Sequence, residues 1–395
     1  MPSSISAFDK RLKRRVSGRT NAFFAVCPPG LTGLCQKELL ALAPRLDRMG
    51  LLSQGQTIDD IDIQVGGVSF NTRLDLACLA NLFLGTPTRI LMRLARFRAT
   101  HFAELEKGLK AVDWELFLPT LPRIRASAKK SRLFHSDAIA ARCRQVLETR
   151  FNETPESSQQ VLMVRGEADT FDISLDMGGD PLFKRGIKPG GVRAPLRETL
   201  AFAMLTRLNL SVKDVLADPM AGSGTFSLEG AMIRAGIPPG MFRSFAFEAW
   251  PGFQQARFAH AKKRIQDNII FSTLPPIYTS DLDPGAVEAL EQTRSRHDFL
   301  HPMDISCQNF FNQPAPAGTG VVVLNPPYGK RIGRDKDITG FYREIGRKLS
   351  RDYRGWRFGI ICPQPRLMTA LDLALTPMPL FHGGLDIAAG LGTIP

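Results

Sequence analysis

The sequence predicts an α/β protein in which a Rossmann-like, doubly wound domain follows a smaller α+β, ferredoxin-like region. From about residue 180, short apolar runs alternate with segments of helical spacing, the pattern of a parallel sheet covered by helices. Polar residues stop several of these runs abruptly, as at Asp218-Pro219, Asp281-Leu282-Asp283 and Asn325-Pro326-Pro327. Before residue 180, strands and helices are more mixed.

The first elements alternate as strand, helix, strand and helix. Residues 21–27 read as a strand, 31–42 as a helix, 61–70 as strands around Gly66-Gly67, and 74–84 as a helix. This alternation predicts a small ferredoxin-like unit.

The next stretch, residues 86–176, is rich in arginine and lysine. Residues 102–114 and 136–147 have helical spacing, and 161–164 and 171–175 read as strands. Such charges form either a solvated face or a surface for nucleic-acid phosphates. The best local candidates for nucleic-acid contact are Arg125, Lys129, Lys130 and Arg142.

The remaining elements follow doubly wound order. We expect helices at 195–208, 227–235, 286–296, 338–349 and 365–375. We expect strands at 214–217, 276–280, 321–324 and 356–362, a strand end within 305–310, and a final hairpin at 379–391.

The bulk properties indicate a nucleic-acid partner and a reducing compartment. A net charge of +13 and a pI of about 9.7 are common among proteins that meet nucleic acid or anionic membranes. No run of about 18 apolar residues is present, so no transmembrane helix is expected. The six cysteines include no CxxC pair, which argues against zinc and disulfides and for the cytoplasm. We expect no metal and a monomer.

The first twenty residues are basic but lack the apolar core of a secretory signal. They read either as a disordered tail or as an arm that contacts phosphates.

A turn of small residues joins the strand at 214–217 to the next helix. Its glycines let a ligand approach the backbone, and the helix N-terminus lies at the carboxyl edge of the sheet. No Gly-Lys-Ser/Thr or GxGxxG pattern is present, which disfavours a phosphate loop and nicotinamide binding. Asp218 could pair with a ligand ammonium group.

The next two strand ends carry further polar residues. Asp281 is placed to accept both hydroxyls of a ribose, whereas Asp283, ahead of Pro284, caps the following helix. Asn309 either contacts an adenine edge or serves as an ordinary turn residue.

The stretch 321–329 looks built to bind a planar group that carries an amine. Two prolines cannot continue a central strand, which leaves Asn325 at the strand end. Its side chain and the backbone carbonyls can accept from an –NH2 group, and Tyr328 offers a flat face for stacking. Together the four strand ends describe S-adenosyl-L-methionine opposite an exocyclic amino group.

From about residue 23 onward the chain resembles the THUMP-domain, class I RNA guanine-N2 methyltransferases. The opening strand and helix at 23–40 carry this resemblance, together with the segments 66–70, 182–186, 194–201, 218–225, 281–284, 325–329 and 381–385. The segments 182–186 and 194–201, which lead into the catalytic domain, are the most specific. Asn309 departs from the pattern, since the family usually has Asp there.

The resemblance implies a domain plan and a set of site residues. The plan is a basic tail at 1–20, an N-terminal ferredoxin-like part at 21–62, a THUMP domain at 63–176 and a methyltransferase domain at 177–395. The implied cofactor-binding residues are Ala194, Pro195, Leu196, Glu198, Asp218, Ala221, Gly222, Gly224, Thr225, Asp281, Asn309 and Asn325. The catalytic residues are Asn325, Pro326, Pro327 and Tyr328, and Lys184, Arg185, Lys330 and Arg331 flank the site as further RNA contacts.

The resulting hypothesis is S-adenosyl-L-methionine-dependent methylation of guanine N2 in RNA, with 23S ribosomal RNA as first choice. A guanine of transfer RNA, another base amine and a protein glutamine amide all present the same –NH2 group. The motif alone does not exclude any of them as the substrate. A catalytically idle RNA-binding or ribosome-assembly factor is the alternative of a different class.

Overall fold

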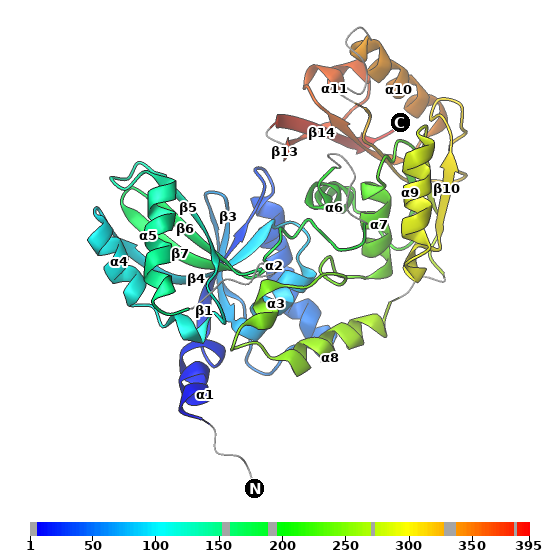
Figure 1. Cartoon of the computed structure of the whole chain (residues 1–395). Helices are drawn as coiled ribbons and strands as arrows, with labels where there is room; N and C mark the ends of the chain where they lie inside the picture. Colours follow the sequence, from blue (N-terminus) through cyan, green and yellow to red (C-terminus); the bar gives the residue numbers. More distant parts are fainter. Residues whose placement is uncertain (1–5, 152–158, 189–195, 270–272, 328–336, 383–384) are drawn as a thin grey trace. The chain divides into compact units, whose positions relative to one another are not determined.

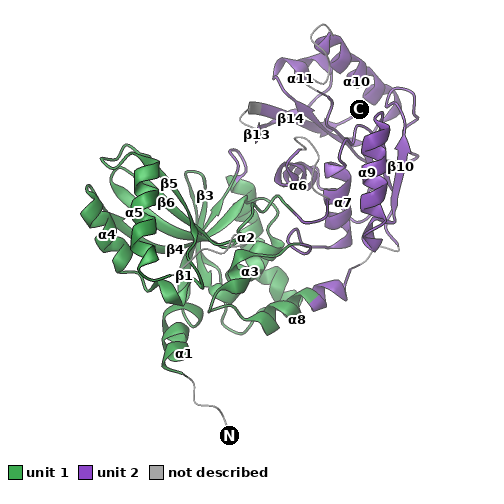
Figure 2. Cartoon of the chain, viewed as in Figure 1, with its two compact units in different colours: residues 1–27, 32–184, 243–262 green, residues 28–31, 185–242, 263–395 purple. Residues whose placement is uncertain are grey.

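The computed structural model describes residues 6–151, 159–188, 196–269, 273–327, 337–382 and 385–395. Within them the chain forms two compact units (Figure 2). Unit 1 comprises residues 1–27, 32–184 and 243–262, and unit 2 comprises 28–31, 185–242 and 263–395. The structure thus groups residues 243–262 with unit 1, whereas the domain plan assigned them to the methyltransferase domain.

The first half of unit 1 is a βαββαβ unit. Strand β1 pairs antiparallel with both β3 and β4, and β2 pairs with β3, so the order is β2-β3-β1-β4. This is the ferredoxin-like arrangement that the sequence predicts. Its elements are β1 (Thr20–Val26), α2 (Thr32–Arg48), β2 (Asp59–Gln64), β3 (Gly67–Arg73), α3 (Leu74–Phe83) and β4 (Arg89–Arg98).

The second half extends the same sheet through β4-β7-β6-β5. Strand β7 runs antiparallel to β4 and β6, whereas β5 is parallel to β6. Helices α4 and α5 lie beside these strands (Figure 1). The elements are α4 (Phe102–Lys110), the 3-10 turn η2 (Trp114–Leu116), β5 (Arg123–Lys129), α5 (Ser136–Glu148), β6 (Val161–Glu167) and β7 (Thr170–Asp176).

The N-terminal stretch is helical, with α1 at Ala7–Leu12 and η1 at Lys13–Ser17. Val16 is buried in unit 1, and the side chains of Arg11 and Arg15 pair with Glu115 and Asp113. The expectation of a disordered tail is therefore wrong for residues 7–17, because an apolar contact and two ion pairs attach them.

Residues 243–262 add a turn η3 (Ala246–Ala249) and most of α8 (Gln255–Gln266) to unit 1. The guanidinium of Arg243 donates to four backbone carbonyls of residues 178–184. The indole of Trp250 donates to Gln160 (2.8 Å), and four phenylalanine rings of the segment pack on one another. The sequence analysis assigned no element to this segment.

Unit 2 contains a seven-stranded sheet in the order β10-β9-β8-β11-β12-β14-β13. Strands β8 to β12 are parallel, and β14 is antiparallel to β12 and β13. The predicted doubly wound sheet and final hairpin are confirmed. The strands are β8 (Val215–Asp218), β9 (Ile277–Asp281), β10 (Met303–Cys307), β11 (Gly320–Leu324), β12 (Arg357–Cys362), β13 (Thr376–His382) and β14 (Leu385–Thr393). The helices are α6 (Glu198–Arg207), α7 (Thr225–Ala235), α9 (Pro284–Arg294), η4 (Asp298–Leu300), α10 (Ile338–Asp352) and α11 (Arg366–Ala370).

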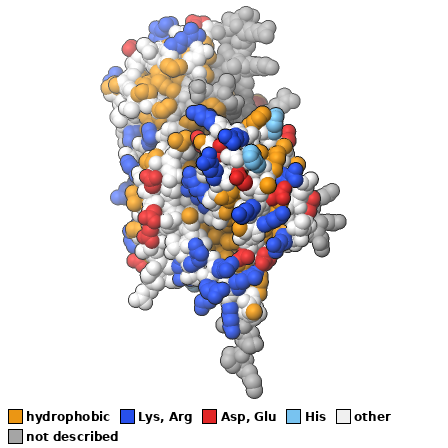
Figure 3. Space-filling model, turned by 90° about the vertical axis from the view of Figure 1, so that its left-hand side faces the viewer, with side chains coloured by type: hydrophobic (Ala, Val, Ile, Leu, Met, Phe, Trp, Pro, Cys, Tyr) orange, Lys and Arg blue, Asp and Glu red, His pale blue; other side chains and the backbone are white. Residues whose placement is uncertain are grey.

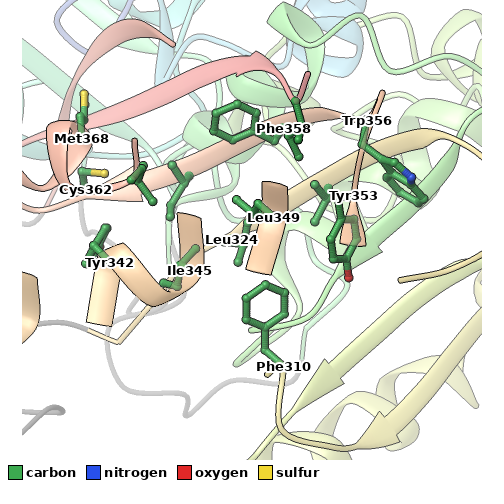
Figure 4. Packing of buried hydrophobic residues seen from close by; sticks show 14 of the residues in the cluster. Phe310, Leu324, Tyr342, Ile345, Leu349, Tyr353, Trp356, Phe358, Cys362 and Met368 are labelled. Atoms are coloured by element: carbon green, nitrogen blue, oxygen red, sulfur yellow. The ribbon is translucent and has the colours of Figure 1, made fainter. Parts of the chain in front are cut away.

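One apolar core holds α10 and α11 against β11 and β12 (Figure 4). The four residues Val321–Leu324 are fully buried, as expected for a central strand. Tyr342 on α10 donates its hydroxyl to the carbonyl oxygen of Ile361 (2.8 Å), so the polar tip of this buried ring is satisfied. This packing fixes where β11 ends and therefore where Asn325 lies.

Candidate active site

The order of the unit 2 sheet reverses between β8 and β11, which are neighbours but are separated in sequence by β9 and β10. Ligands of open α/β sheets bind beyond the carboxyl ends of the strands at such a switch point. Strand β8 ends at Asp218, and Asn325 directly follows β11. The fold thus places these two sequence-predicted residues at the expected ligand-binding edge.

The carboxyl group of Asp218 is fully buried and only half satisfied. Its Oδ2 accepts hydrogen bonds from the backbone N–H (3.1 Å) and the hydroxyl (2.8 Å) of Ser227, at the start of α7. Its Oδ1 is buried without a partner among the described residues. Burial raises the pKa of Asp218 to about 7, although the Ser227 bonds oppose that shift. A cationic group beside Oδ1 would favour the ionised form.

Two glycines of the turn before α7 have different reasons to be glycine. Both have a positive φ, +52° at Gly222 and +68° at Gly224. A Cβ at Gly224 would lie 2.2 Å from Cδ2 of Leu290, so close packing against α9 excludes a side chain there. A Cβ at Gly222 would meet no described heavy atom within 4 Å. The space at Gly222 can therefore receive a ligand.

The turn is attached to the end of β9. The backbone N–H of Ala221 donates to the carbonyl oxygen of Ser280 (3.0 Å), and that of Gly222 donates to Oδ2 of Asp281 (2.7 Å). The other carboxylate oxygen of Asp281 accepts from the N–H of Asp283 (2.9 Å). Asp281 thus shapes the glycine turn, while its ribose contact stays a prediction.

Asp283 is the N-cap of α9, as predicted. Its Oδ1 accepts from the backbone N–H of Gly285 (3.0 Å), and Pro284 occupies the first helical turn. Asn309 closes a local turn, because its Oδ1 accepts from the N–H of Phe311 (3.0 Å). A contact of Asn309 with adenine stays a prediction.

Lys188 is a site residue that the sequence analysis missed. Its ammonium group donates to the hydroxyls of Thr225 (2.6 Å) and Ser223 (3.3 Å) and pairs with Glu198 (3.3 Å). The Thr225 hydroxyl lies 3.3 Å from the carbonyl oxygen of Leu196. Lys188 therefore connects two predicted cofactor residues, Glu198 and Thr225. The sequence feature that could have identified Lys188 is its position two residues after Gly186, within the segment that leads to Glu198.

Asn325 presents a second unused acceptor. Its Oδ1 is buried and has no partner among the described residues. Pro326 is buried and Pro327 exposed, and neither has an N–H to donate. An incoming N–H donor would satisfy the Asn325 oxygen. Ala194, Pro195, Tyr328, Lys330 and Arg331 lie outside the described residues.

The predicted RNA contacts differ in availability. Arg125, Lys129 and Lys130 are exposed and have no acidic partner among the described residues. Lys184 is exposed beside Asp180. Arg142 pairs with Glu106 (3.0 Å) and covers the ring of Phe102, so it also joins α5 to α4.

The assignment of Arg185 to RNA is wrong. Arg185 is 4% exposed, and its Nε lies 2.9 Å from Oε1 of Glu229 on α7, whose side chain is equally buried. A guanidinium enclosed with its own carboxylate cannot reach a phosphate in solvent. Arg185 instead neutralises a buried charge inside unit 2.

The described residues fit a cofactor with a charged tail. Two buried acceptor oxygens without partners among the described residues, on Asp218 and Asn325, flank the switch point, and Gly222 leaves space on the turn that follows β8. The cationic group of Lys188 lies on the same turn. Among the described residues no group of three or more His, Cys, Asp or Glu could hold a metal ion. None of the helices described is long and apolar enough to cross a membrane.

Two curated relatives match most of the chain. It is 32% identical over 87% of its length to Ribosomal RNA large subunit methyltransferase K/L of Methylococcus capsulatus, and it covers 47% of that relative. It is also 29% identical over 93% of its length to slr0064 of Synechocystis sp., provisionally named an RNA methyltransferase, and it covers 96% of that relative. The chain thus spans about half the length of the K/L methyltransferases that it matches.

The fold recurs in a crystal structure titled as that of a possible methylase from Clostridium difficile 630. That structure covers 95% of this chain and is itself covered to 99%, with a TM-score of 0.82 at 23% identity. At that identity the likeness concerns the fold.

The family model UPF0020, described as the RMKL-like methyltransferase domain, matches residues 185–378. That range holds β8 to β12 and the strand ends described above. The predictions of a methyltransferase and of S-adenosyl-L-methionine as its methyl donor are thereby confirmed. Residues 185–378 of this chain are therefore similar to the RMKL-like methyltransferase domain.

Proposed function

We propose that the chain transfers a methyl group from S-adenosyl-L-methionine to the exocyclic N2 amine of a guanine in RNA, with large-subunit ribosomal RNA as the substrate. The observation that carries the proposal is the unused acceptor of Asn325, followed by two prolines, at the switch point opposite Asp218. The choice of ribosomal RNA rests on the names of the K/L relatives and on the resemblance of the sequence.

Four residues of unit 2 would hold the cofactor. Asp218 Oδ1 suits the ammonium of its methionine part, and the ammonium group of Lys188 suits its carboxylate. Gly222 leaves room for the chain between these charges, and Asp281 suits the ribose hydroxyls. When bound, the cofactor supplies an electrophilic methyl group on a sulfonium.

Asn325 and Pro326 would orient the amine. The lone pair of a guanine amine is delocalised into the ring, which makes the amine a poor nucleophile. Hydrogen bonds from its two N–H groups to the Asn325 side-chain oxygen and the Pro326 carbonyl favour a pyramidal nitrogen. The lone pair then points at the methyl group.

Alignment supplies most of the rate enhancement in this scheme. Well-oriented reactants reach effective molarities of about 10⁵–10⁸ M, so no strong base is required. The amine loses its proton only after it has become cationic. The described strand ends contain no His or Glu at the amine-binding position, which agrees with this mechanism.

The target base must leave its stack to reach Asn325. Extrusion costs a few kcal/mol and less for an unpaired base, which favours loops or helix ends as substrates. Tyr328 is proposed to stack on the extruded ring. The exposed Arg125, Lys129 and Lys130 of unit 1 are proposed to contact RNA phosphates.

The test is mass spectrometry of nucleosides from a strain that lacks the gene. We expect N2-methylguanosine to fall in 23S ribosomal RNA and to return when the wild-type gene is supplied. If N2-methylguanosine is lost only from transfer RNA, the substrate is transfer RNA instead of ribosomal RNA. If it is lost from neither pool, the proposal is overturned. Calorimetry distinguishes the methyltransferase from the catalytically idle RNA-binding factor, because the idle factor would not bind S-adenosyl-L-methionine at millimolar concentration.

The variant Asn325→Ala tests the role of the amide. Methyl transfer should fall at least about 100-fold, as when a transition-state hydrogen bond is removed, while cofactor affinity is kept. Asn268→Ala, at an exposed residue just beyond the end of α8, is the control and should leave both unchanged. An Asn325→Ala enzyme with normal turnover would refute the assigned role.

A further inference from the structure

The loop between β5 and α5, residues 130–135, carries an exposed aromatic pair that the core of unit 1 does not use. The side chain of Phe134 is 61% exposed, and its ring lies with its centroid 4.0 Å from that of His135, which is also exposed. An exposed aromatic ring offers a flat apolar face on which a planar group can stack.

Hydrogen bonds to the β6–β7 turn hold this loop in place. The backbone N–H of Arg132 donates to Oδ1 of Asp169 (2.7 Å), and the N–H of Asp169 donates to the hydroxyl of Ser131 (3.1 Å). The N–H of Ala168 donates to the carbonyl oxygen of Lys129 (3.1 Å). The neighbouring Leu133 is buried. The aromatic pair is therefore presented on a preformed support.

Three residues with positive φ lie at the same place. Lys130, Ala168 and Asp169 have φ values of +51°, +48° and +63°, in the left-handed region that side chains other than glycine seldom adopt. At Ala168 and Asp169 these are the positive φ values that a two-residue hairpin turn requires, whereas at Lys130 such a conformation costs roughly 1–3 kcal/mol and persists where surrounding contacts hold it. Here the cross-loop hydrogen bonds supply those contacts.

Three basic residues precede the aromatic pair in this loop region, and the exposed acidic Asp137 follows it. Lys129, Lys130 and Arg132 are exposed, and their side chains have no acidic partner among the described residues. The carboxylate of Asp169 faces the backbone N–H of Arg132. Figure 3 shows many lysine and arginine side chains on the face that it draws, with acidic, histidine and hydrophobic side chains among them. A flat apolar face with unpaired cations in the same loop matches a nucleobase flanked by phosphates.

We propose that Phe134 and His135 form a stacking platform for an unpaired base of the RNA substrate, with Lys129, Lys130 and Arg132 on the neighbouring phosphates. The inference rests on the proposed RNA substrate. It adds a contact between unit 1 and a second base, different from the guanine that Asn325 binds. A duplex keeps its bases stacked on one another, so the platform selects single-stranded RNA over double-stranded RNA.

The experiment is fluorescence anisotropy with a labelled single-stranded RNA and a duplex of the same length. We expect Phe134→Ala to weaken single-strand binding about tenfold, within the range of base–aromatic stacking, and to leave duplex binding unchanged. Phe134→Trp should retain the affinity. Leu40→Ala, also an exposed apolar side chain of unit 1 at 58% exposure, is the control. Equal affinities of Phe134→Ala and wild type, or an equal loss with duplex, would overturn the platform.

The basic rim has its own readout. Replacing Lys129, Lys130 and Arg132 by Gln should flatten the salt dependence of single-strand binding by about 0.7 in log–log slope for each lost phosphate contact. An unchanged slope would show that these three residues do not contact RNA phosphates. Because Phe134 is exposed, its substitution should leave the melting temperature unchanged.

Failures of the two proposals are distinguishable. Binding that depends on Phe134 without any methylated product supports the platform and overturns guanine methylation. Normal methylation with unchanged affinity in Phe134→Ala overturns the platform alone. If no RNA binds, the platform and the RNA substrate both fail, and calorimetry with S-adenosyl-L-methionine still reports on the donor site.

Discussion

Asp218 couples the stability of the chain to pH because its carboxyl group is completely buried. Its pKa is about 7 in the folded chain against an ordinary 3.8. The unfolded chain therefore releases this proton near pH 4, whereas the folded chain keeps it until about pH 7. In that window the folded state binds more protons, so the contribution of Asp218 to stability falls as pH rises and levels off above 7.

We expect Asp218→Asn to remove this part of the pH dependence. Between pH 5 and pH 7 the wild type should lose roughly 1–3 kcal/mol more unfolding free energy than the variant. Urea unfolding at both pH values measures the difference. Parallel pH profiles of the two proteins would contradict the raised pKa.

Arg185 and Glu229 form a buried ion pair in which each side chain neutralises the charge of the other. Arg185→Met leaves the Glu229 carboxylate uncompensated and should destabilise unit 2 by about 3–5 kcal/mol. Arg185→Met combined with Glu229→Leu should recover much of that loss, since no unpaired charge remains. Thermal unfolding of the single and double variants checks both statements. A stable Arg185→Met protein with weakened RNA binding would instead restore the surface role predicted from the sequence.

At the scale of the element, the two glycines of the turn before α7 have different roles. Gly224 allows close packing against α9, and Gly222 leaves space for a ligand. Gly224→Ala places a Cβ against the buried Leu290 and should cost about 1–3 kcal/mol beyond the backbone strain. Gly222→Ala carries only the left-handed backbone cost of roughly 1–2 kcal/mol, because no described atom lies nearby.

The two variants should therefore differ in what they lose. We expect Gly224→Ala to have the lower melting temperature and Gly222→Ala to lose the greater part of its affinity for S-adenosyl-L-methionine. Calorimetry and thermal unfolding of both proteins make the comparison. If Gly222→Ala binds the cofactor normally, the open space beside Gly222 does not receive it.

The regular elements were predictable where apolar periodicity was strong. Strand β11 and the strands around it follow from buried runs bounded by polar stops, and Asp283-Pro284 marks the start of α9. Helix α8 was missed because its segment lies between strands and carries aromatic residues at irregular spacing. The helical N-terminus was missed because its basic residues resemble a solvated tail, while only Leu12 and Val16 are buried.

At the scale of the whole molecule, the segment 243–262 belongs to unit 1 although it lies between elements of unit 2 in sequence. Phe258 is buried there among Phe245, Phe247 and Phe253, and the same segment lies against Leu74 at the start of α3. The fold of unit 1 thus depends on residues that are synthesised after residues 185–242 of unit 2.

Phe258→Ala should loosen unit 1 selectively. The substitution removes a large buried ring at a cost of about 3–5 kcal/mol. Amide hydrogen exchange should accelerate in α3, while β8 and β11 of unit 2 keep their protection. Phe8→Ala, at an exposed aromatic side chain of α1, is the control. Equal acceleration in both units would show that they unfold together.

By itself the sequence determined the types and order of most elements, the doubly wound sheet and the polar residues at its strand ends. Periodicity and proline or glycine stops are local properties, so they can be read along the chain. Only the tertiary structure decided which charges are used, because burial depends on residues distant in sequence. It enclosed Arg185 with Glu229, joined Lys188 to Glu198 and Thr225, left one oxygen of Asp218 without a partner, and exposed Phe134 beside Lys129 and Lys130.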